Sequence, residues 1–332
     1  YIVAETKAEL PKLPFGKKII YALGQFGWSL ASYGVLNLIN YFYMPPEQET
    51  GAIFPTFIFQ GAILGIITIV GLVNAGGRLF DAVTDPFIAG LSDRSRSPWG
   101  KRRLFMTIGI LPFVIFSVLV FTPPAAGRTP INTVWFIISI VLFYLAMTIY
   151  VIPYTALISE LGHDSNERLT LSTLISITWA LGFAVGNQIY VLQSIFEQSM
   201  GPVRGFQVAI TIFAVVSFIF MALPIIFIDE KKYAEDHVSK EGSFQALKSA
   251  FRNRNFRLFT LSDFMYWLAL TFIQTGISFY VTILMKLPKA FASLLMTILF
   301  LLSFAFYVPV TFIARKIGKK LLVIIAFAVF SL

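Results

Sequence analysis

The sequence contains no cysteine and only two histidines, His163 and His237. The lack of cysteine excludes disulfide bonds, thiol catalysis and cysteine-ligated metals, and both histidines fall in predicted loops, which argues against a zinc or haem site. Charged residues are also few, at 13% of the chain, while 57% of the residues are hydrophobic and 16% are aromatic. Soluble domains do not have this composition, so we predict an all-α integral membrane protein.

The formal net charge of +9 would fit a nucleic-acid partner as well as a membrane, but its distribution favours the membrane. Of the 26 lysines and arginines, 21 fall in segments on the N-terminal side of the predicted membrane, four fall on the opposite side, and Arg78 lies within a span. Cytoplasmic loops of membrane proteins are enriched in Lys and Arg. We therefore predict a cytoplasmic N-terminus and no nucleic-acid partner.

Apolar runs separated by polar loops predict the order of the spans. We place them at 19–44, 55–91, 104–121, 134–158, 169–195, 207–228, 261–285 and 290–313, with a ninth beginning near Leu321. The segment 55–91 exceeds one membrane thickness, so its helix is predicted to be tilted or extended. These spans divide the chain into a cytoplasmic tail, a six-helix bundle, a cytoplasmic amphipathic connector and the start of a second bundle. The four segments are 1–18, 19–228, 229–259 and 260–332.

The basic segment 314–320 in the second half is similar to the segment 94–103 in the first half. Two parallel six-span halves joined by a basic connector are typical of many secondary transporters. The chain does not begin with Met, and its last apolar run has about 12 residues, fewer than the roughly 20 that cross a membrane. We therefore expect a partial chain that contains about nine of twelve spans.

One apolar segment carries three charged residues, Arg78, Asp81 and Asp85. Each costs roughly 3 kcal/mol at a bilayer centre, so these residues must pair, face a wet cavity or bind an ion. Asp81 and Asp85 lie one helical turn apart on one face, with Thr84 beside them. Their oxygens suit a small monovalent cation or a shared proton. The alternative is an ion pair between Arg78 and Asp81 that only holds neighbouring helices together.

Several short patterns together resemble a known family. The longest is Arg78-x-x-Asp81-x-x-Thr84-Asp85-Pro86, followed by Gly90, Asp93 and Trp99-Gly-Lys-Arg102. Others are Tyr-Ala-Leu-Gly-x-Phe-Gly at 21–27, Ile-Pro-Tyr at 152–154 and Glu-Arg at 167–168. In these residues the chain resembles the glycoside-pentoside-hexuronide:cation symporters, the melibiose permease-like branch of the major facilitator superfamily. The resemblance implies a major facilitator helical bundle in the bacterial cytoplasmic (inner) membrane.

The resemblance also implies roles for residues of the second span. Asp81 and Asp85 would coordinate the coupling Na⁺, Li⁺ or H⁺, and Thr84 would assist them. Apart from the resemblance, the spacing places Arg78 about one turn before Asp81, so Arg78 is the predicted charge partner of the acids.

Other positions depart from the sugar-binding members of that family. Those members carry an acid in the first span and an acid before the proline of the fourth span, where this chain has Ser29 and Val151. They carry an arginine in the fifth span, where Ile175 stands, and an aromatic residue near the position of Thr155. A hydrogen bond to a charged group contributes about 1.5–3 kcal/mol, so a simple galactoside is not the expected solute.

Polar residues within the spans are the candidate solute contacts, because amides and aromatic rings recognise sugars by hydrogen bonding and stacking. They are Gln25, Trp28, Tyr33, Tyr150, Tyr154, Trp179, Asn187 and Gln274, with Asn37 and Gln188 as further amides in the first and fifth spans. For each, the alternative is a hydrogen bond between helices or a place in the interfacial aromatic belt. Four charged residues are expected to form a cytoplasmic gate instead. They are Asp93, Arg94, Arg102 and Arg103.

We therefore expect a cation-coupled (Na⁺ or H⁺) symporter of a small organic solute, a sugar or glycoside, that works by alternating access. Cation binding would neutralise the two carboxylates, and only then would the occluded form be low in energy. The alternatives are a symporter of a lysolipid or another amphiphile, since sodium-coupled lysophosphatidylcholine transporters share the acid pair, and a transport-inactive scaffold subunit. No Ser/His, metal or redox constellation predicts an enzyme. The expected partners are the solute and membrane lipids, for a monomer or a subunit of a larger membrane complex, with no cofactor beyond the coupling ion.

Overall fold

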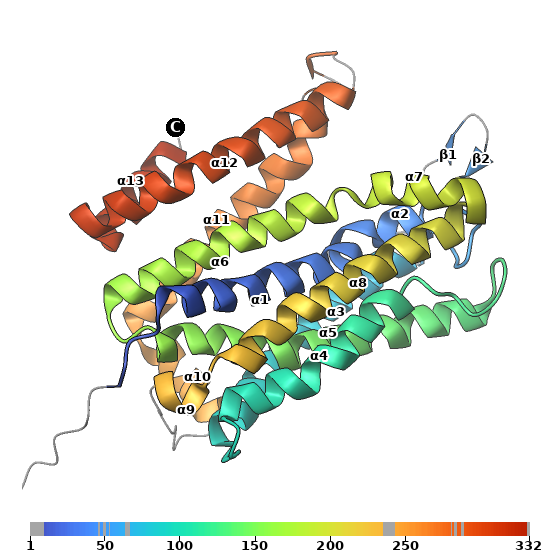
Figure 1. The fold of residues 1–332 in the computed structure, drawn as a ribbon. Coiled ribbons are helices and arrows are strands. Elements are labelled where there is room, and N and C mark those ends of the chain that lie inside the picture. Colours follow the sequence, from blue (N-terminus) through green and yellow to red (C-terminus); the bar gives the residue numbers. More distant parts are fainter. Residues whose placement is uncertain are drawn as a thin grey trace, which may run out of the picture. The chain divides into compact units, whose positions relative to one another are not determined.

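The computed structural model describes residues 10–45, 47–48, 51–52, 54–63, 67–234, 243–279, 281, 284–286 and 289–330. The chain forms two compact units, residues 1–239 and 240–332. Both units are built from helices, which Figure 1 colours from the blue N-terminus to the red C-terminus.

The first unit contains the helices that carry the candidate site. In chain order they are α1 (Phe15–Tyr33), the π-helix η1 (Gly34–Leu38), α2 (Ile39–Tyr43), α3 (Ile69–Arg94), α4 (Lys101–Leu119), α5 (Pro130–Leu161), α6 (Ser165–Gly186), α7 (Ile189–Met200), α8 (Pro202–Phe227) and α9 (Glu230–Tyr233). The short strands β1 (Glu47–Gln48) and β2 (Gly51–Ala52) pair antiparallel after α2. This helical content agrees with the predicted all-α class.

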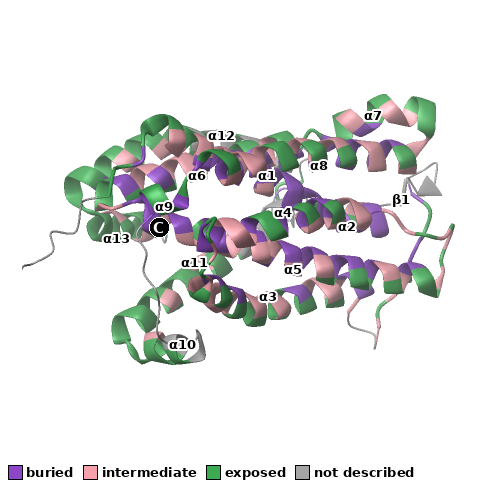
Figure 2. Cartoon of the chain, turned by 60° about the horizontal axis from the view of Figure 1, so that its bottom comes forward, coloured by how far each residue is buried: buried purple, intermediate pink, exposed green. Residues whose placement is uncertain are grey.

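Four stretches of described helix are long and apolar enough to cross a membrane. They are α4, α5, α6 continued by α7, and α8. Large apolar side chains on their outer faces are exposed, among them Ile138, Val191 and Ile219, and Figure 2 shows such positions in green. Because lipid tails are as apolar as these side chains, their exposure has no hydration cost in a membrane.

The helices of the first unit pack closely where glycines remove side chains from the contacts. α1 packs against α6 and α8, α5 packs against α3 and α4, and α4 also contacts α8. A Cβ atom at Gly27 of α1 would lie 2.8 Å from the backbone nitrogen of Met221 in α8. A Cβ atom at Gly109 of α4 would lie 2.8 Å from the backbone nitrogen of Tyr150 in α5. Close backbone approach of this kind stabilises helix association within membranes.

The predicted second span is corrected at its start. The helix begins at Ile69, whereas residues 54–63 and 67–68 form irregular structure that includes a single bridge between Ile63 and Ile67. Pro55 and Gly61 disfavour helix there, and Phe57 is nevertheless buried in the core of the unit. The apolar run 55–91 is therefore longer than its helix, because its first part is irregular structure that packs into the core of the unit.

The second unit contains α10 (Ser243–Arg252), α11 (Arg254–Phe279), α12 (Lys289–Ile317) and α13 (Lys319–Phe330). The side chain of Asn253 accepts a 2.9 Å hydrogen bond from the backbone N–H of Asn255 and thereby caps α11. The ring of Tyr266 in α11 stacks on that of Phe327 in α13, with centroids 5.6 Å apart. The predicted connector 229–259 therefore contains the short helix α10 and the first turns of α11.

Candidate functional site

Two acidic residues of α3 lie beside a hydroxyl group of α5. The Thr148 hydroxyl donates a 3.0 Å hydrogen bond to Asp85 Oδ1. One turn earlier, Asp81 Oδ1 is buried with no hydrogen-bond partner among the described residues. Because desolvation of an unpaired carboxylate oxygen is costly, this is the atom at which a cation or a proton would be most favourable.

The remaining predicted ligand, Thr84, lies between the two acids. Its hydroxyl donates a 3.0 Å hydrogen bond to the carbonyl of Phe80, one turn earlier in α3. The hydroxyl proton is thus used within the helix, and the oxygen lone pairs remain available as acceptors. The side-chain oxygens offered by this part of the structure are therefore those of Asp81, Thr84 and Asp85 in α3 and the Thr148 hydroxyl in α5.

The surroundings of the two acids fix α3 against α5. Gly77 lies against the ring of Tyr144, and a Cβ atom at Gly77 would lie 2.9 Å from Tyr144 Cδ2. Arg78, the predicted charge partner, has an exposed side chain, and no ion pair joins it to Asp81 or Asp85 in the described part of the chain. Asp81 Oδ1 is therefore not occupied by a permanent cationic side chain.

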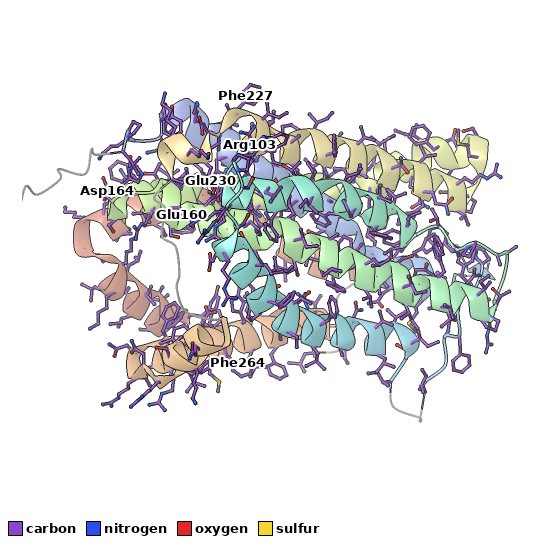
Figure 3. All side chains as sticks on the ribbon, turned by 90° about the horizontal axis from the view of Figure 1, so that it is seen from below. Arg103, Glu160, Asp164, Phe227, Glu230 and Phe264 are labelled. Atoms are coloured by element: carbon purple, nitrogen blue, oxygen red, sulfur yellow. The ribbon has the colours of Figure 1, made fainter. Side chains whose placement is uncertain are left out.

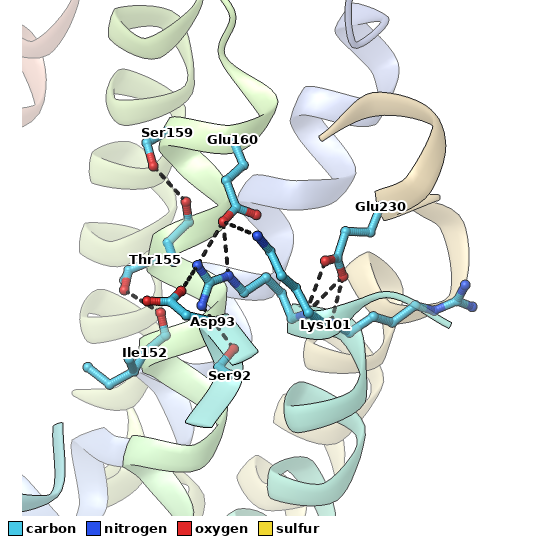
Figure 4. A network of polar contacts seen from close by, with 11 residues as sticks. Ser92, Asp93, Lys101, Ile152, Thr155, Ser159, Glu160 and Glu230 are labelled. Carbon is cyan, nitrogen blue, oxygen red and sulfur yellow. Dashed lines mark hydrogen bonds and ion pairs between the residues drawn. The ribbon is translucent and has the colours of Figure 1, made fainter. Parts of the chain in front are cut away.

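A second polar cluster joins the ends of α3, α4 and α5 (Figure 4). The Arg102 guanidinium forms ion pairs with Asp93 and with Glu160, where Nη2 lies 2.7 Å from Oε1. Its Nη1 atom donates a 2.9 Å hydrogen bond to Ser92 Oγ, and Lys101 Nζ lies 3.5 Å from Glu160 Oε1. Arg102 and Glu160 are both buried. Their mutual pairing is needed because an uncompensated buried charge is strongly destabilising.

The first turn of α4 is capped from a distant part of the chain. The backbone N–H groups of Arg102 and Arg103 donate hydrogen bonds of 2.9–3.1 Å to the Glu230 carboxylate. Gly100, which precedes the helix, has a φ angle of +106° and no side chain for capping, and a Cβ atom there would lie 2.7 Å from Glu230 Cδ. A negative charge at this place favours the helix dipole. Burial raises the pKa of Glu230, and the two backbone hydrogen bonds oppose that rise.

Two of the four predicted gate residues, Asp93 and Arg102, are brought together by the structure. Arg94 ends α3 with an exposed side chain. Arg103 contributes its backbone N–H to the Glu230 cap, and its Nε atom is buried without a hydrogen-bond partner in the described chain.

Sequence reasoning missed Glu160 and Glu230, which Figure 3 labels near Arg103 in the first unit. Glu160 had a usable signal, because it is the single charged residue of the sequence 130–161. Glu230 had none, since it lies in a run of charged residues that an ordinary exposed connector would also contain.

Two of the predicted solute contacts form hydrogen bonds between helices in this conformation. Tyr150 and Tyr154 are fully buried. The Tyr150 hydroxyl donates a 2.9 Å hydrogen bond to the Met221 carbonyl, and the Tyr154 hydroxyl donates a 2.6 Å hydrogen bond to the Tyr21 carbonyl. These bonds hold α5 to α8 and to α1.

On α1, Gln25 is buried, whereas Trp28 is partly buried and its indole Nε1 has no hydrogen-bond partner among the described residues. Ser29, which stands where sugar-binding members carry an acid, is fully buried and donates a 2.7 Å hydrogen bond to the Gln25 carbonyl. A Cβ atom at Gly182 of α6 would lie 3.1 Å from Ser29 Cβ. The backbone of α6 therefore fills the space beside Ser29.

The remaining predicted contacts are distributed over three helices. The Tyr33 hydroxyl donates a hydrogen bond to Asn187 Oδ1. The ring of Trp179 packs on that of Phe183, with centroids 4.6 Å apart. Gln274 belongs to α11, and its side chain lies outside the described residues.

The sequence matches a known family over residues 20–331, described as MFS/sugar transport protein. The chain belongs to the MFS/sugar transport protein family. The match confirms the predicted relationship to major facilitator symporters and the all-α membrane fold class. Members of this family are transport proteins, so the chain is not an enzyme.

Several curated proteins that are similar to this chain are named as symporters or transporters. The chain is 29% identical over 231 residues to the inner membrane symporter YicJ of Escherichia coli (strain K12). The aligned region covers 69% of this chain and 49% of YicJ. It is 26% identical over 265 residues to the isoprimeverose transporter of Lactiplantibacillus pentosus, and the aligned region covers 78% of this chain and 51% of that transporter. It is 26% identical over 152 residues to the sodium-dependent lysophosphatidylcholine symporter 1 of Xenopus tropicalis, and the aligned region covers 43% of this chain and 28% of that symporter. The chain spans about half the length, or less, of these relatives.

Proposed function

We propose that this protein is a cation-coupled symporter of a sugar or glycoside that works by alternating access. This proposal depends on the buried Oδ1 atom of Asp81, which has no hydrogen-bond partner among the described residues. One turn later, Asp85 accepts a hydrogen bond from Thr148. A carboxylate so placed is stabilised when a cation or a proton arrives and destabilised when it leaves. The family, and the names of YicJ and the isoprimeverose transporter, support a sugar-like solute.

The ion would couple to the solute through the energy of the occluded form. With the site empty, Asp81 and Asp85 place negative charge within a membrane span, and a closed, drier site raises that cost. Bound Na⁺ or a proton removes most of this cost, so the occluded form becomes populated only when the ion is present. A ligand can shift such an equilibrium only by its difference in affinity for the two states.

The Asp93–Arg102–Glu160 cluster would act as the gate on the cytoplasmic side. The N-terminus would lie on the same side, as the distribution of Lys and Arg favours. The ion pairs of Arg102 hold α3, α4 and α5 together at one end, so opening that end would require their rearrangement. The first unit would then correspond to the N-terminal helical bundle of such a symporter, and the second unit would belong to its other bundle.

A lysolipid or another amphiphile is the second candidate solute. Val151 and Ile175 are partly buried and pack against the apolar core, at positions where sugar-binding members carry charged groups. The similarity to the sodium-dependent lysophosphatidylcholine symporter 1 favours the same reading. Ser29, enclosed by α6, offers no charge for a sugar hydroxyl either.

The test is uptake by protein reconstituted in liposomes, driven by a Na⁺, Li⁺ or proton gradient. The solutes are radiolabelled lactose, isoprimeverose and xylose, with lysophosphatidylcholine as the competing class. Asp85→Asn should abolish ion-driven uptake, whereas Asp263→Asn, an exposed acid of α11, should leave it unchanged. Ion-driven uptake that persists in Asp85→Asn would overturn the ion site, and uptake of lysophosphatidylcholine alone would replace the sugar. Absence of any ion-driven uptake, with the protein intact, would favour a scaffold subunit.

A further inference from the structure

Two interruptions of regular helix lie at the same level of adjacent helices. The π-helix η1 separates α1 from α2, and residues 187–188 separate α6 from α7. Asn37 lies 22 residues after Phe15, where α1 begins, and Asn187 lies 22 residues after Ser165, where α6 begins. At about 1.5 Å per residue both lie roughly 33 Å along their helices, close to the thickness of the hydrocarbon core. α1 and α6 run side by side in Figure 1.

One tyrosine connects the two interruptions. Tyr33, the residue before η1, donates from its hydroxyl to Asn187 Oδ1 and accepts at its carbonyl a 3.1 Å hydrogen bond from Asn37 Nδ2. Gly186 allows the approach, because a Cβ atom there would lie 2.7 Å from Tyr33 Cδ1. Single π-helical turns and broken membrane helices occur frequently at functional sites, where the freed backbone groups contact ligands.

These bonds leave complementary polar groups on the two asparagines. Asn187 uses its oxygen to accept from Tyr33, so its amide NH₂ remains as a donor. Asn37 uses its NH₂ to donate to Tyr33, so its amide oxygen remains as an acceptor. Neither remaining group has a hydrogen-bond partner within the described part of the chain. The two asparagines bond to opposite ends of Tyr33, its hydroxyl and its backbone carbonyl. A hydroxyl group both donates and accepts, so a ligand that carries several hydroxyls along its length can bond to both amides.

The exposure of these amides indicates contact with water. Asn37, Asn187 and Gln188 are exposed although they belong to otherwise apolar spans. An amide without a partner would be costly in hydrocarbon, so we expect this surface to face water and not lipid.

The surroundings also select the charge of the ligand. No Asp, Glu, Lys or Arg occurs at 33–44 or at 183–196, and the next charged residue, Glu197, is acidic. An anionic solute would therefore find no opposite charge in these two segments. Tyr190, one turn after Asn187, is 43% exposed, and its ring can stack on the apolar face of a sugar ring.

We propose that Asn37 and Asn187 form a subsite for a neutral polyhydroxylated solute at the paired interruptions of α1 and α6–α7, with Tyr33 as the residue that positions Asn187. This inference rests on the proposed symport. The subsite lies far along α1 and α6 from their first residues, so it would meet a solute on the side of the membrane opposite to the N-terminus. It would distinguish neutral carbohydrates from uronates and from zwitterionic lysolipids.

The experiment measures the concentration dependence of ion-driven uptake of radiolabelled lactose, isoprimeverose and xylose. Asn37→Ala and Asn187→Ala should each raise KM by about 5- to 30-fold, the range expected for one lost hydrogen bond, with kcat changed little. Tyr33→Phe should raise KM in the same direction, because it frees Asn187 without removing it. Gln198→Ala removes an exposed amide of α7 and should leave KM unchanged.

Two further measurements separate the possible failures. Asn187→Asp keeps the acceptor for Tyr33 and loses the donor, so it should raise KM even if Asn187→Ala does not fold. The stabilisation of each variant by Na⁺ or Li⁺ should match that of the unchanged protein, because the ion site is elsewhere. Unchanged KM in both Asn37→Ala and Asn187→Asp would overturn the subsite. If the unchanged protein shows no ion-driven uptake of any of the three sugars, the proposed function fails, and this inference with it.

Discussion

The hydroxyl groups of Tyr21 and Tyr154 each donate a hydrogen bond to the backbone carbonyl of the other residue. Their rings stack with centroids 4.5 Å apart, and both side chains are fully buried. This reciprocal pair joins α1 to α5 directly, and the Tyr150 hydroxyl extends the connection to α8. Three helices of the first unit are therefore held at fixed depth relative to one another.

Tyr154→Phe should lower the free energy of unfolding by about 1 kcal/mol, the usual net value of a buried hydrogen bond. Tyr21→Phe should have a similar effect, because each substitution removes one hydroxyl and leaves the stacked rings in place. Thermal unfolding in detergent micelles measures both. Tyr190→Phe, at a partly exposed ring, is the matched control and should change stability little. Equal effects of the three substitutions would contradict a special role for the pair.

Gly100→Ala should destabilise the first unit more than Gly127→Ala. Both glycines have positive φ angles, +106° and +70°, so both substitutions strain the backbone. A Cβ atom at Gly127 meets nothing within 4 Å, whereas one at Gly100 would collide with Glu230. The collision should add about 1–3 kcal/mol to the loss of unfolding free energy. Chemical denaturation of the two variants side by side is the measurement, and indistinguishable curves would argue against the cap.

Glu160→Ala should reduce the unfolding free energy by about 3–5 kcal/mol, because it leaves the buried Arg102 guanidinium without its main partner. Lys12→Ala breaks the exposed ion pair with Asp164 and should have a much smaller effect. Differential scanning fluorimetry on both variants provides the comparison. A mild effect of Glu160→Ala would mean that Asp93 alone satisfies Arg102.

The stability of the fold should depend on pH in the acidic range because of Asp164. Hydrogen bonds from the backbone N–H of Glu167 and from Lys12 lower the pKa of Asp164 to about 2. Since this value lies below the ordinary carboxylate value of about 4, the ionised form stabilises the fold above pH 4, and this contribution is lost as the pH falls from about 4 to 2. Asp164→Asn keeps a capping oxygen but does not titrate, so stability curves of this variant should be flatter in that window. The same slope in both proteins would assign the transition to other carboxylates.

Thr148→Val should weaken Na⁺ or Li⁺ binding by about 5- to 10-fold while preserving the fold, because the two side chains have similar volume and only the hydroxyl near Asp85 is lost. Thr155→Val is the control, since Thr155 is exposed and its hydroxyl donates to the carbonyls of Val151 and Ile152 in its own helix. The measurement is the shift of melting temperature with cation concentration at constant ionic strength. An unchanged cation response in Thr148→Val would remove α5 from the ion site.

The sequence alone predicted the membrane class, the helix that carries Asp81 and Asp85, and the family. The first two depend on local quantities: the length of apolar runs, the cost of charge within them, and the 3.6-residue period that places the two acids on one face. The family was predicted from its resemblance in short motifs such as residues 78–86. Thr148 was not predicted as their neighbour, because one hydroxyl among many in an apolar span has no local signal. Its role depends on how α3 packs on α5.

The same limit explains the differences at the ends of helices. Glu230 caps α4 across 128 residues of sequence, and periodicity within either segment contains no information about that contact. The apolar run predicts a span over 55–91, yet the helix begins at Ile69 and Phe57 is buried without helical structure. Burial of apolar side chains does not require a helix when the backbone lies at the ends of other helices.

The carboxylate that completes the first turn of α4 also sets an order of events during synthesis. The ribosome makes Arg102 well before Glu230, because 128 residues separate them. Until α9 emerges, the backbone amide groups of Arg102 and Arg103 at the start of α4 lack their native acceptor. The last short helix of the first unit thus closes a structure begun much earlier, so a nascent chain stopped just before residue 230 would carry an unfinished α4.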